Sequence, residues 1–281
     1  MADLEWHIVI AASSGYEPGL KAFLNSFKKY HPESDIIIHC LGLELKQDLI
    51  EDYPWVNHVK LDWVNVVPRN TAWSTKIPRF KYAAELNGIV MLADADMFFC
   101  SSMNNYFKIA EQGFIVAGAN GSNFQFGQNW RDKYQIDMPD IFWHKTITSV
   151  PTILDTKLHG QVWMDLYNHK MTIGTGADFD LQNIFMAKHN KLDDIVVLPS
   201  QQVTGVHHFY LKPDTRIVRK CGKLMTNDGL ELLMVHGKWW QEGWFNQLMI
   251  TMQRYCQTEK CIKGAEDSRK TLKQEFDSLV G

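Results

Sequence analysis

The chain has 281 residues, 45% of them hydrophobic, and a formal net charge of −3. This length can bury one large α/β core or two small ones. The charge balance, with an isoelectric point near 6.4, argues against an extended nucleic-acid surface.

The apolar segments and the cysteines limit the cellular setting. The longest apolar runs are strand-sized and no positively charged leader precedes one, so we expect neither a signal peptide nor a membrane span. The odd number of cysteines and the lack of a C-x-x-C pair argue against a zinc cluster and favour free thiols in a cytoplasmic protein. These cysteines are Cys40, Cys100, Cys221, Cys256 and Cys261.

The first third of the chain alternates strand-like and helix-like segments. Strands are expected at residues 7–12, 36–41, 56–61 and in the run that ends at Asp94, and helices at residues 20–30, 45–53 and 77–86. This alternation predicts an α/β fold with a mostly parallel central sheet, right-handed crossovers and flanking helices.

After Asp96 the pattern is weaker. Strands are expected at residues 113–119, 195–198 and 230–236 and helices near 162–167 and 178–189, whereas residues 121–145 give no clear prediction. We expect one domain over residues 1–240 and a helical C-terminal extension, residues 241–281, packed on it.

The most informative motif is the pair Asp94 and Asp96 within residues 88–99, where it closes an apolar run that is expected to be a buried strand. In an extended backbone, residues i and i+2 point to the same side, so both carboxylates can face one cation. Their oxygens suit Mg²⁺ or Mn²⁺, and open α/β sheets bind ligands at the carboxyl ends of their strands. An acidic turn without a metal is the alternative.

Two further segments offer phosphate or nucleotide contacts. Lys76 and Arg79 are three residues apart and would share one face of a helix, where they suit phosphate or carboxylate oxygens. A solvated basic face is the alternative. The loop of residues 13–19 contains neither a dinucleotide fingerprint nor a P-loop; with Ala11 and Ser13 at its start, it would hold a nucleotide base or ribose, or form an ordinary turn.

Two segments in the second half complete the set. A glycine-rich turn places Asp178 and Asp180 at the start of a helix, with Asn183 one turn further on. Helix capping explains such acidic residues equally well. His236 ends a strand-like run and is a good third metal ligand, while Lys238 is placed to neutralise a phosphate.

Together these motifs resemble those of GT-A fold glycosyltransferases, in particular the glycogenin-like and lipopolysaccharide galactosyltransferase group called family 8. The matching pieces are L-A-D-A-D at 92–96, D-F-D-L-Q-N at 178–183 and H-G-K-W-W at 236–240. The family often has Gln where Phe179 stands, so the donor sugar stays open.

The resemblance implies an enzyme that transfers a hexose from a UDP-sugar to an unknown acceptor, with retention of the anomeric configuration. It implies Mn²⁺ (or Mg²⁺) bound by Asp94, Asp96 and His236 against the donor diphosphate. The implied catalytic residues are Asp178, Asp180 and Lys238. The implied contacts to the nucleotide-sugar come from Ala11, Ser13, Lys76, Arg79, Asp94, Ala95, Gly237 and Lys238.

Four other functions share single features with this sequence. A haloacid-dehalogenase-type phosphatase also uses Asp-x-Asp, but expects Thr or Val where Phe98 stands. A nucleotidyltransferase needs a glycine-rich basic loop after the first strand, whereas residues 13–19 contain neither Lys nor Arg. A glycoside hydrolase needs two carboxylates on opposite sides of the bond that it cleaves, and Asp94 and Asp96 are too close in sequence for that. A catalytically weak sugar-nucleotide-binding module stays open, as does the phosphatase.

Overall fold

The computed structural model describes residues 4–43, 47–60, 77–125, 143–172, 178–204, 216–244 and 258–281. They divide into two compact units. The first contains residues 1–14, 35–94 and 104–198, and the second contains residues 15–34, 95–103 and 199–281. The predicted boundary between residues 240 and 241 stays a prediction.

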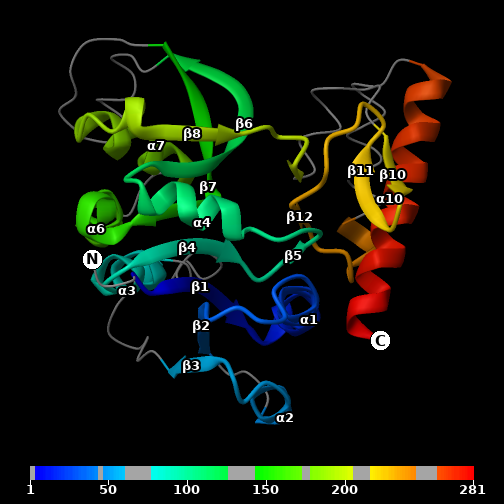
Figure 1. Cartoon of the computed structure of the whole chain (residues 1–281), viewed down its shortest axis with the longest axis horizontal. Helices are drawn as coiled ribbons and strands as arrows, with labels where there is room; N and C mark the ends of the chain where they lie inside the picture. The colour runs from blue at the N-terminus through cyan, green and yellow to red at the C-terminus, as the bar shows by residue number, and fades with distance from the viewer. Residues whose placement is uncertain are drawn as a thin grey trace. The chain divides into compact units, whose positions relative to one another are not determined.

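A seven-stranded sheet forms the first unit, in the order β3-β2-β1-β4-β7-β6-β8 (Figure 1). Its strands are β1 (Trp6–Ser13), β2 (Ile37–Leu43), β3 (Asn57–Lys60), β4 (Ile89–Asp94), β6 (Ile115–Gln125), β7 (Trp143–Asp155) and β8 (Ile195–Leu198). Neighbouring strands are parallel except around β7, which runs antiparallel to both β4 and β6. The predicted mostly parallel sheet with flanking helices is confirmed.

The sheet forms because its central strands are continuously apolar. All six residues of β4 are buried, and so are residues 7–12 of β1. Burial on both faces is typical of parallel strands covered by helices. The helices of this unit are α2 (Gln47–Asp52), α3 (Ile77–Glu85), α4 (Asn104–Glu111), α6 (Thr156–Thr172) and α7 (Asp178–Lys188), with a 3₁₀ turn at Leu192–Asp194.

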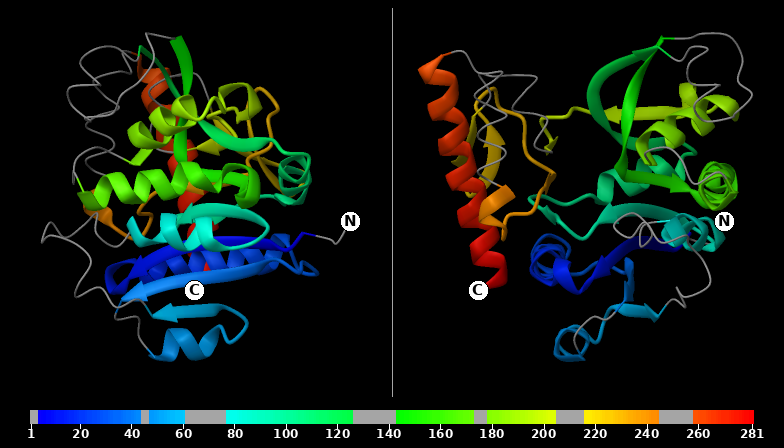
Figure 2. Two further views of the ribbon diagram at one scale, coloured as in Figure 1. Left: turned by 90° about the vertical axis from the view of Figure 1, so that its left-hand side faces the viewer. Right: turned by 180° about the vertical axis from the view of Figure 1, so that it is seen from behind.

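Among its described residues, the second unit has two small sheets and two long helices. Its elements are η1 (Ser14–Tyr16), α1 (Glu17–Tyr30), β5 (Met97–Phe99), β9 (Val203–Thr204), β10 (Ile217–Lys220), β11 (Lys223–Thr226), β12 (Met234–His236) and α10 (Glu259–Val280). The strands pair as β5-β12-β9 and β10-β11. α10 runs alongside β10 and β11, as Figure 1 and the right-hand view of Figure 2 show. Leu272 and Phe276 of α10 pack with Phe98 and Trp239 in one buried core.

Several element boundaries differ from the prediction. The strand expected at residues 230–236 is shorter, because only β12 pairs with β5 and β9. The helix expected near residue 162 begins at Thr156, directly after β7. Among the described residues, no helix combines the length and the apolar character needed to cross a membrane.

Candidate functional site

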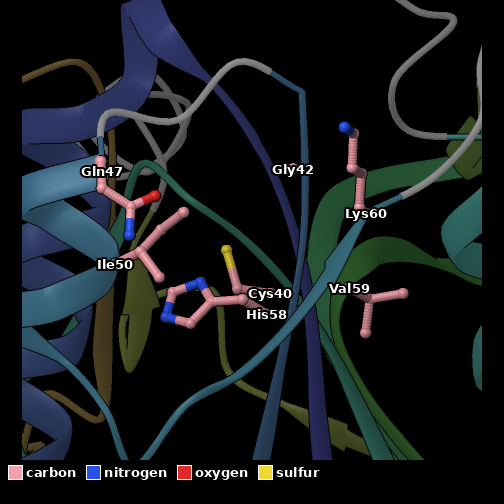
Figure 3. A pocket seen from close by; sticks show the side chains of 7 residues that line it. All are labelled: Cys40, Gly42, Gln47, Ile50, His58, Val59 and Lys60. Carbon is pink, nitrogen blue, oxygen red and sulfur yellow. The ribbon is translucent and has the colours of Figure 1, made fainter.

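A pocket of about 320 Å³ in the first unit is lined by none of the predicted site residues. It is bounded by β2, β3 and α2, and Cys40 and His58 project into it (Figure 3). Burial raises the pKa of the Cys40 thiol to about 12, so this cysteine is protonated at neutral pH and is a poor nucleophile or metal ligand. Cys100 and Cys221 are also free thiols, whereas Cys256 and Cys261 fall outside the described side chains.

The predicted metal ligands are set by strand ends. Asp94 is the last residue of β4 and pairs with Ala11 in β1. Asp96 directly precedes β5, and β5 pairs with β12 so that Met97 lies opposite His236. A backbone hydrogen bond of 2.7 Å from the Gly237 N–H to the Asp96 carbonyl oxygen extends this pairing. The strand pairing therefore brings Asp96 and His236 together across 140 residues of sequence.

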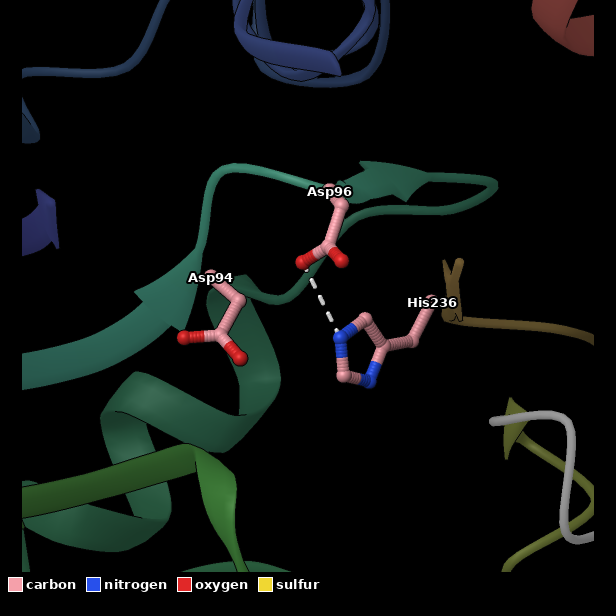
Figure 4. Close-up of side chains that lie close together, drawn as sticks. All are labelled: Asp94, Asp96 and His236. Atoms are coloured by element: carbon pink, nitrogen blue, oxygen red, sulfur yellow. Dashed lines mark hydrogen bonds and ion pairs between the residues drawn. The ribbon is translucent and has the colours of Figure 1, made fainter. Parts of the chain in front are cut away.

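The ligand atoms suit one divalent cation. One side-chain ligand atom of each of Asp94, Asp96 and His236 lies within 4.8 Å of the other two (Figure 4). His236 Nε2 and Asp96 Oδ1 are 3.0 Å apart. Adjacent ligands around an octahedral ion with bonds of about 2.1 Å are separated by about 3.0 Å. Two carboxylates and one imidazole are a donor set that Mn²⁺ accepts.

Arg79 is buried, so the alternative interpretation of this residue as part of a solvated basic face is wrong. Its guanidinium has no exposed surface, and its Nη1 donates to an Asp94 oxygen and, at 3.1 Å, to the Ala93 carbonyl oxygen. Within the described part of the chain, no acceptor takes a hydrogen bond from its Nε or Nη2. Buried donors without acceptors are costly, so this geometry favours an oxygen-rich ligand beside them.

The acidic helix start of α7 is also buried. Asp178 and Asp180 are 5% and 7% exposed. Asp178 Oδ2 is 3.8 Å from Arg79 Nη2, and Asp178 Oδ1 is 3.8 Å from Lys170 Nζ. The Asn183 amide instead exchanges hydrogen bonds of 3.0 and 2.8 Å with the Ile147 backbone, so it ties α7 to β7.

Lys238 follows Gly237, whose backbone lies in the left-handed region that favours glycine. Gly237 has φ of +150°, and a Cβ there would lie 2.4 Å from the Trp244 ring. The Lys238 ammonium lies over the Tyr16 ring, 5.0 Å from its centroid, and Tyr16 packs edge-on against Trp240. These aromatic contacts hold the lysine beside the strand that delivers His236.

The remaining predicted contacts to the nucleotide-sugar are three small residues and one lysine. Ala11 and Ser13 lie in β1, opposite Leu41 and Leu43 of β2. The Ala95 carbonyl oxygen would lie 2.5 Å from a Cβ at Gly19, so the start of α1 approaches it closely. Lys76 lies outside the described residues.

Neither a protein-family model nor a curated protein sequence matches the chain. Solved structures do match. The galactosyltransferase LgtC in complex with donor and acceptor sugar analogues has a TM-score of 0.53 at 12% identity, over 92% of this chain and 99% of that one. The glycosyltransferase GlyE of Streptococcus pneumoniae TIGR4 has a TM-score of 0.51 at 11% identity, over 98% of this chain and 64% of that one.

Mouse xyloside xylosyltransferase 1 has a TM-score of 0.50 at 11% identity, over 84% of this chain and 98% of that one. The chain has the GT-A fold of glycosyltransferases. In this GT-A fold, the described part of the chain brings Arg79, Asp94 and Asp178 together as one buried group.

Two residues near the candidate site were not predicted. Lys170 belongs to a helix whose apolar periodicity is weak, and no motif surrounds it. Tyr16 lies in the loop of residues 13–19, which was identified, but no spacing rule links a tyrosine there to Lys238, 222 positions later. Both contacts depend on the tertiary structure of the GT-A fold.

Proposed function

We propose that this protein is a metal-dependent glycosyltransferase that moves a hexose from a UDP-sugar to an acceptor, with retention of the anomeric configuration. The observation that carries the proposal is the group of Asp94, Asp96 and His236 ligand atoms at the carboxyl end of β4 in a GT-A fold. This is where open α/β sheets bind their ligands, and the donor set suits Mn²⁺ or Mg²⁺.

In this proposal Asp94, Asp96 and His236 hold the cation, which acts as a Lewis acid toward the diphosphate when it is bound. Lys238 adds a positive charge beside the same group. Negative charge develops on the diphosphate as the sugar–phosphate bond breaks, so fixed positive charge there lowers the barrier. No strong general acid is then required.

Arg79 and the acidic start of α7 would bind the rest of the donor. Arg79 fixes the orientation of Asp94 through its Nη1, while its Nε and Nη2 supply donors for oxygens of the nucleotide-sugar. Asp178 and Asp180 would line the space beside the sugar and the acceptor. The proposed further contacts to the nucleotide-sugar are Lys76 and the small residues Ala11, Ser13, Ala95 and Gly237.

The experiment is a screen of UDP-sugars for release of UDP in the presence of Mn²⁺, with and without chelator. We expect release by the parent protein and a loss of at least tenfold in Asp96→Asn, about the effect of weakening a metal site. The matched control is Asp165→Asn, because Asp165 forms a similar pair with His189, 2.9 Å long, in the first unit. Equal release by the parent and Asp96→Asn would contradict the metal-dependent proposal.

The same assay separates the open alternatives. A sugar-nucleotide-binding module would bind the UDP-sugar without releasing UDP, and a phosphatase would release inorganic phosphate instead. The anomer of the first-formed product, followed by NMR, tests retention. Inversion would refute only that part of the proposal.

A further inference from the structure

Lys170, near the end of α6, is a buried cation that no sequence motif predicted. It is 8% exposed, and its ammonium lies 3.8 Å from Asp178 Oδ1. A buried lysine is rare unless it is paired, because removing an ammonium from water is costly. The partner of Lys170 is Asp178, a proposed site residue, so the pair links this buried cation to the candidate site.

The Asp178 carboxylate lies between two cations. Lys170 faces Oδ1, and the Arg79 Nη2 faces Oδ2, each at 3.8 Å. The other end of the same guanidinium, Nη1, is bonded to Asp94. Four buried charges from four elements, α6, α7, α3 and β4, thus form one chain of ion pairs within the first unit.

In this series of ion pairs, only the Arg79 guanidinium separates Asp178 from Asp94. If Asp94 binds the cation that holds the donor diphosphate, the next group along the donor is the sugar bonded to that diphosphate. A carboxylate at this position is an acceptor for the sugar's hydroxyl groups. Its two oxygens are held by different cations, so its orientation is restricted.

We propose that Lys170 is a positioning residue for the donor sugar. It fixes Asp178 from the side opposite Arg79, so that the Asp178 carboxylate meets the sugar hydroxyls in one orientation. The inference rests on the proposed function. It assigns to Lys170 a role in binding the sugar and none in binding the nucleoside diphosphate.

The second unit supplies a matched control. Glu275, 2% exposed, also lies between two cations, Lys29 at 2.8 Å and Arg219. Lys29→Met therefore removes one of two cations from a buried carboxylate, as Lys170→Met does, but in a group with no proposed role in donor binding. Loss of stability alone should appear in both variants, and loss of sugar recognition only in Lys170→Met.

The experiment is isothermal titration with UDP and with UDP-glucose, UDP-galactose and UDP-N-acetylglucosamine, all with Mn²⁺. For the UDP-sugar that the parent binds best, we expect Lys170→Met to raise Kd at least tenfold while Kd for UDP changes less than twofold. Lys170→Arg should recover part of the loss, and Lys29→Met should change neither Kd more than twofold. Equal effects on UDP and UDP-sugar, or no effect on either, would overturn the role of Lys170 while leaving the proposed function intact.

A double-mutant cycle keeps the inference testable if Lys170→Met folds poorly. In Asp178→Asn the carboxylate charge is gone, so adding Lys170→Met should leave UDP-sugar affinity unchanged within twofold. Additive losses would show that Lys170 acts independently of Asp178, which refutes the inference. A parent protein that binds no UDP with Mn²⁺ would instead refute the proposed function, and the inference with it.

Discussion

Burial of His31 makes the stability of the second unit depend on pH below neutrality. The imidazole is 4% exposed and stacks on Phe27, with ring centroids 4.8 Å apart. Its Nε2 accepts a hydrogen bond of 2.9 Å from the Met103 backbone N–H. Burial lowers the pKa of His31 from 6.5 to about 4, and protonation of Nε2 would also break this hydrogen bond.

The sign of the pH dependence follows from these two pKa values. As the pH falls, the unfolded chain binds a proton at His31 before the folded protein does, so unfolding becomes more favourable. The contribution of neutral His31 is intact above about pH 6.5 and is lost toward pH 4. We expect a loss of about 2 kcal/mol between pH 7.5 and pH 5, out of about 3.4 kcal/mol in all.

The test is urea unfolding, followed by tryptophan fluorescence, of the parent and His31→Gln at pH 7.5 and pH 5. Glutamine keeps an acceptor oxygen for Met103 and does not titrate. We expect the variant to lose about 2 kcal/mol less than the parent on acidification. Some pH dependence should persist, because burial also lowers the pKa of His39 to about 4. An unchanged pH dependence in His31→Gln would refute the reasoning.

Three further predictions concern the candidate site. Arg79→Met should lower the free energy of unfolding by about 3–5 kcal/mol in urea titrations, because it removes the guanidinium from buried Asp94 and leaves Asp178 with Lys170 alone. The control Lys81→Met, which removes an exposed ion pair with Glu85 and a cation–π contact with Tyr167, should cost less than about 1 kcal/mol. Asp96→Asn should lower Mn²⁺ affinity, measured by calorimetry, by more than the roughly 10–100-fold typical of losing a group that supports a metal ligand. Gly19→Ala should destabilise by about 1–3 kcal/mol in thermal unfolding, because its Cβ would lie 2.5 Å from a backbone carbonyl oxygen; Gly15→Ala, whose Cβ meets nothing within 4 Å, should change stability by less than about 0.5 kcal/mol.

The parts of the fold that were predictable depend on local sequence. The strand ending at Asp94 is a continuous apolar run, and every residue of β4 is buried. The helix predicted at residues 178–189 is α7, because its start carries acidic residues that stabilise a helix N-terminus. In contrast, β7 was missed because its N-terminal part falls in the aromatic and polar stretch of residues 121–145. Its pairing with β6 also shifts register, which obscures the alternation that identifies a strand.

The candidate site divides in the same way. Asp94 and Asp96 could be paired from sequence because only one residue separates them, although the extended backbone assumed for that pairing is wrong: Ala95 and Asp96 form the turn between β4 and β5. Their relation to His236 was inferred from motif resemblance, and its physical basis is the pairing of β5 with β12. No sequence pattern predicts such a pairing between segments so far apart.

Arg79 shows most clearly why residue type alone is insufficient. Its spacing from Lys76 suggested a basic helix face turned toward a ligand, and as a free cation it would have been expected at the surface. The fold instead buries it against Asp94 and near Asp178. The guanidinium pairs with Asp94, and its Nε and Nη2 are buried without a hydrogen-bond acceptor among the described residues. The sequence supplied the charge, but only the tertiary structure determines which carboxylates it serves.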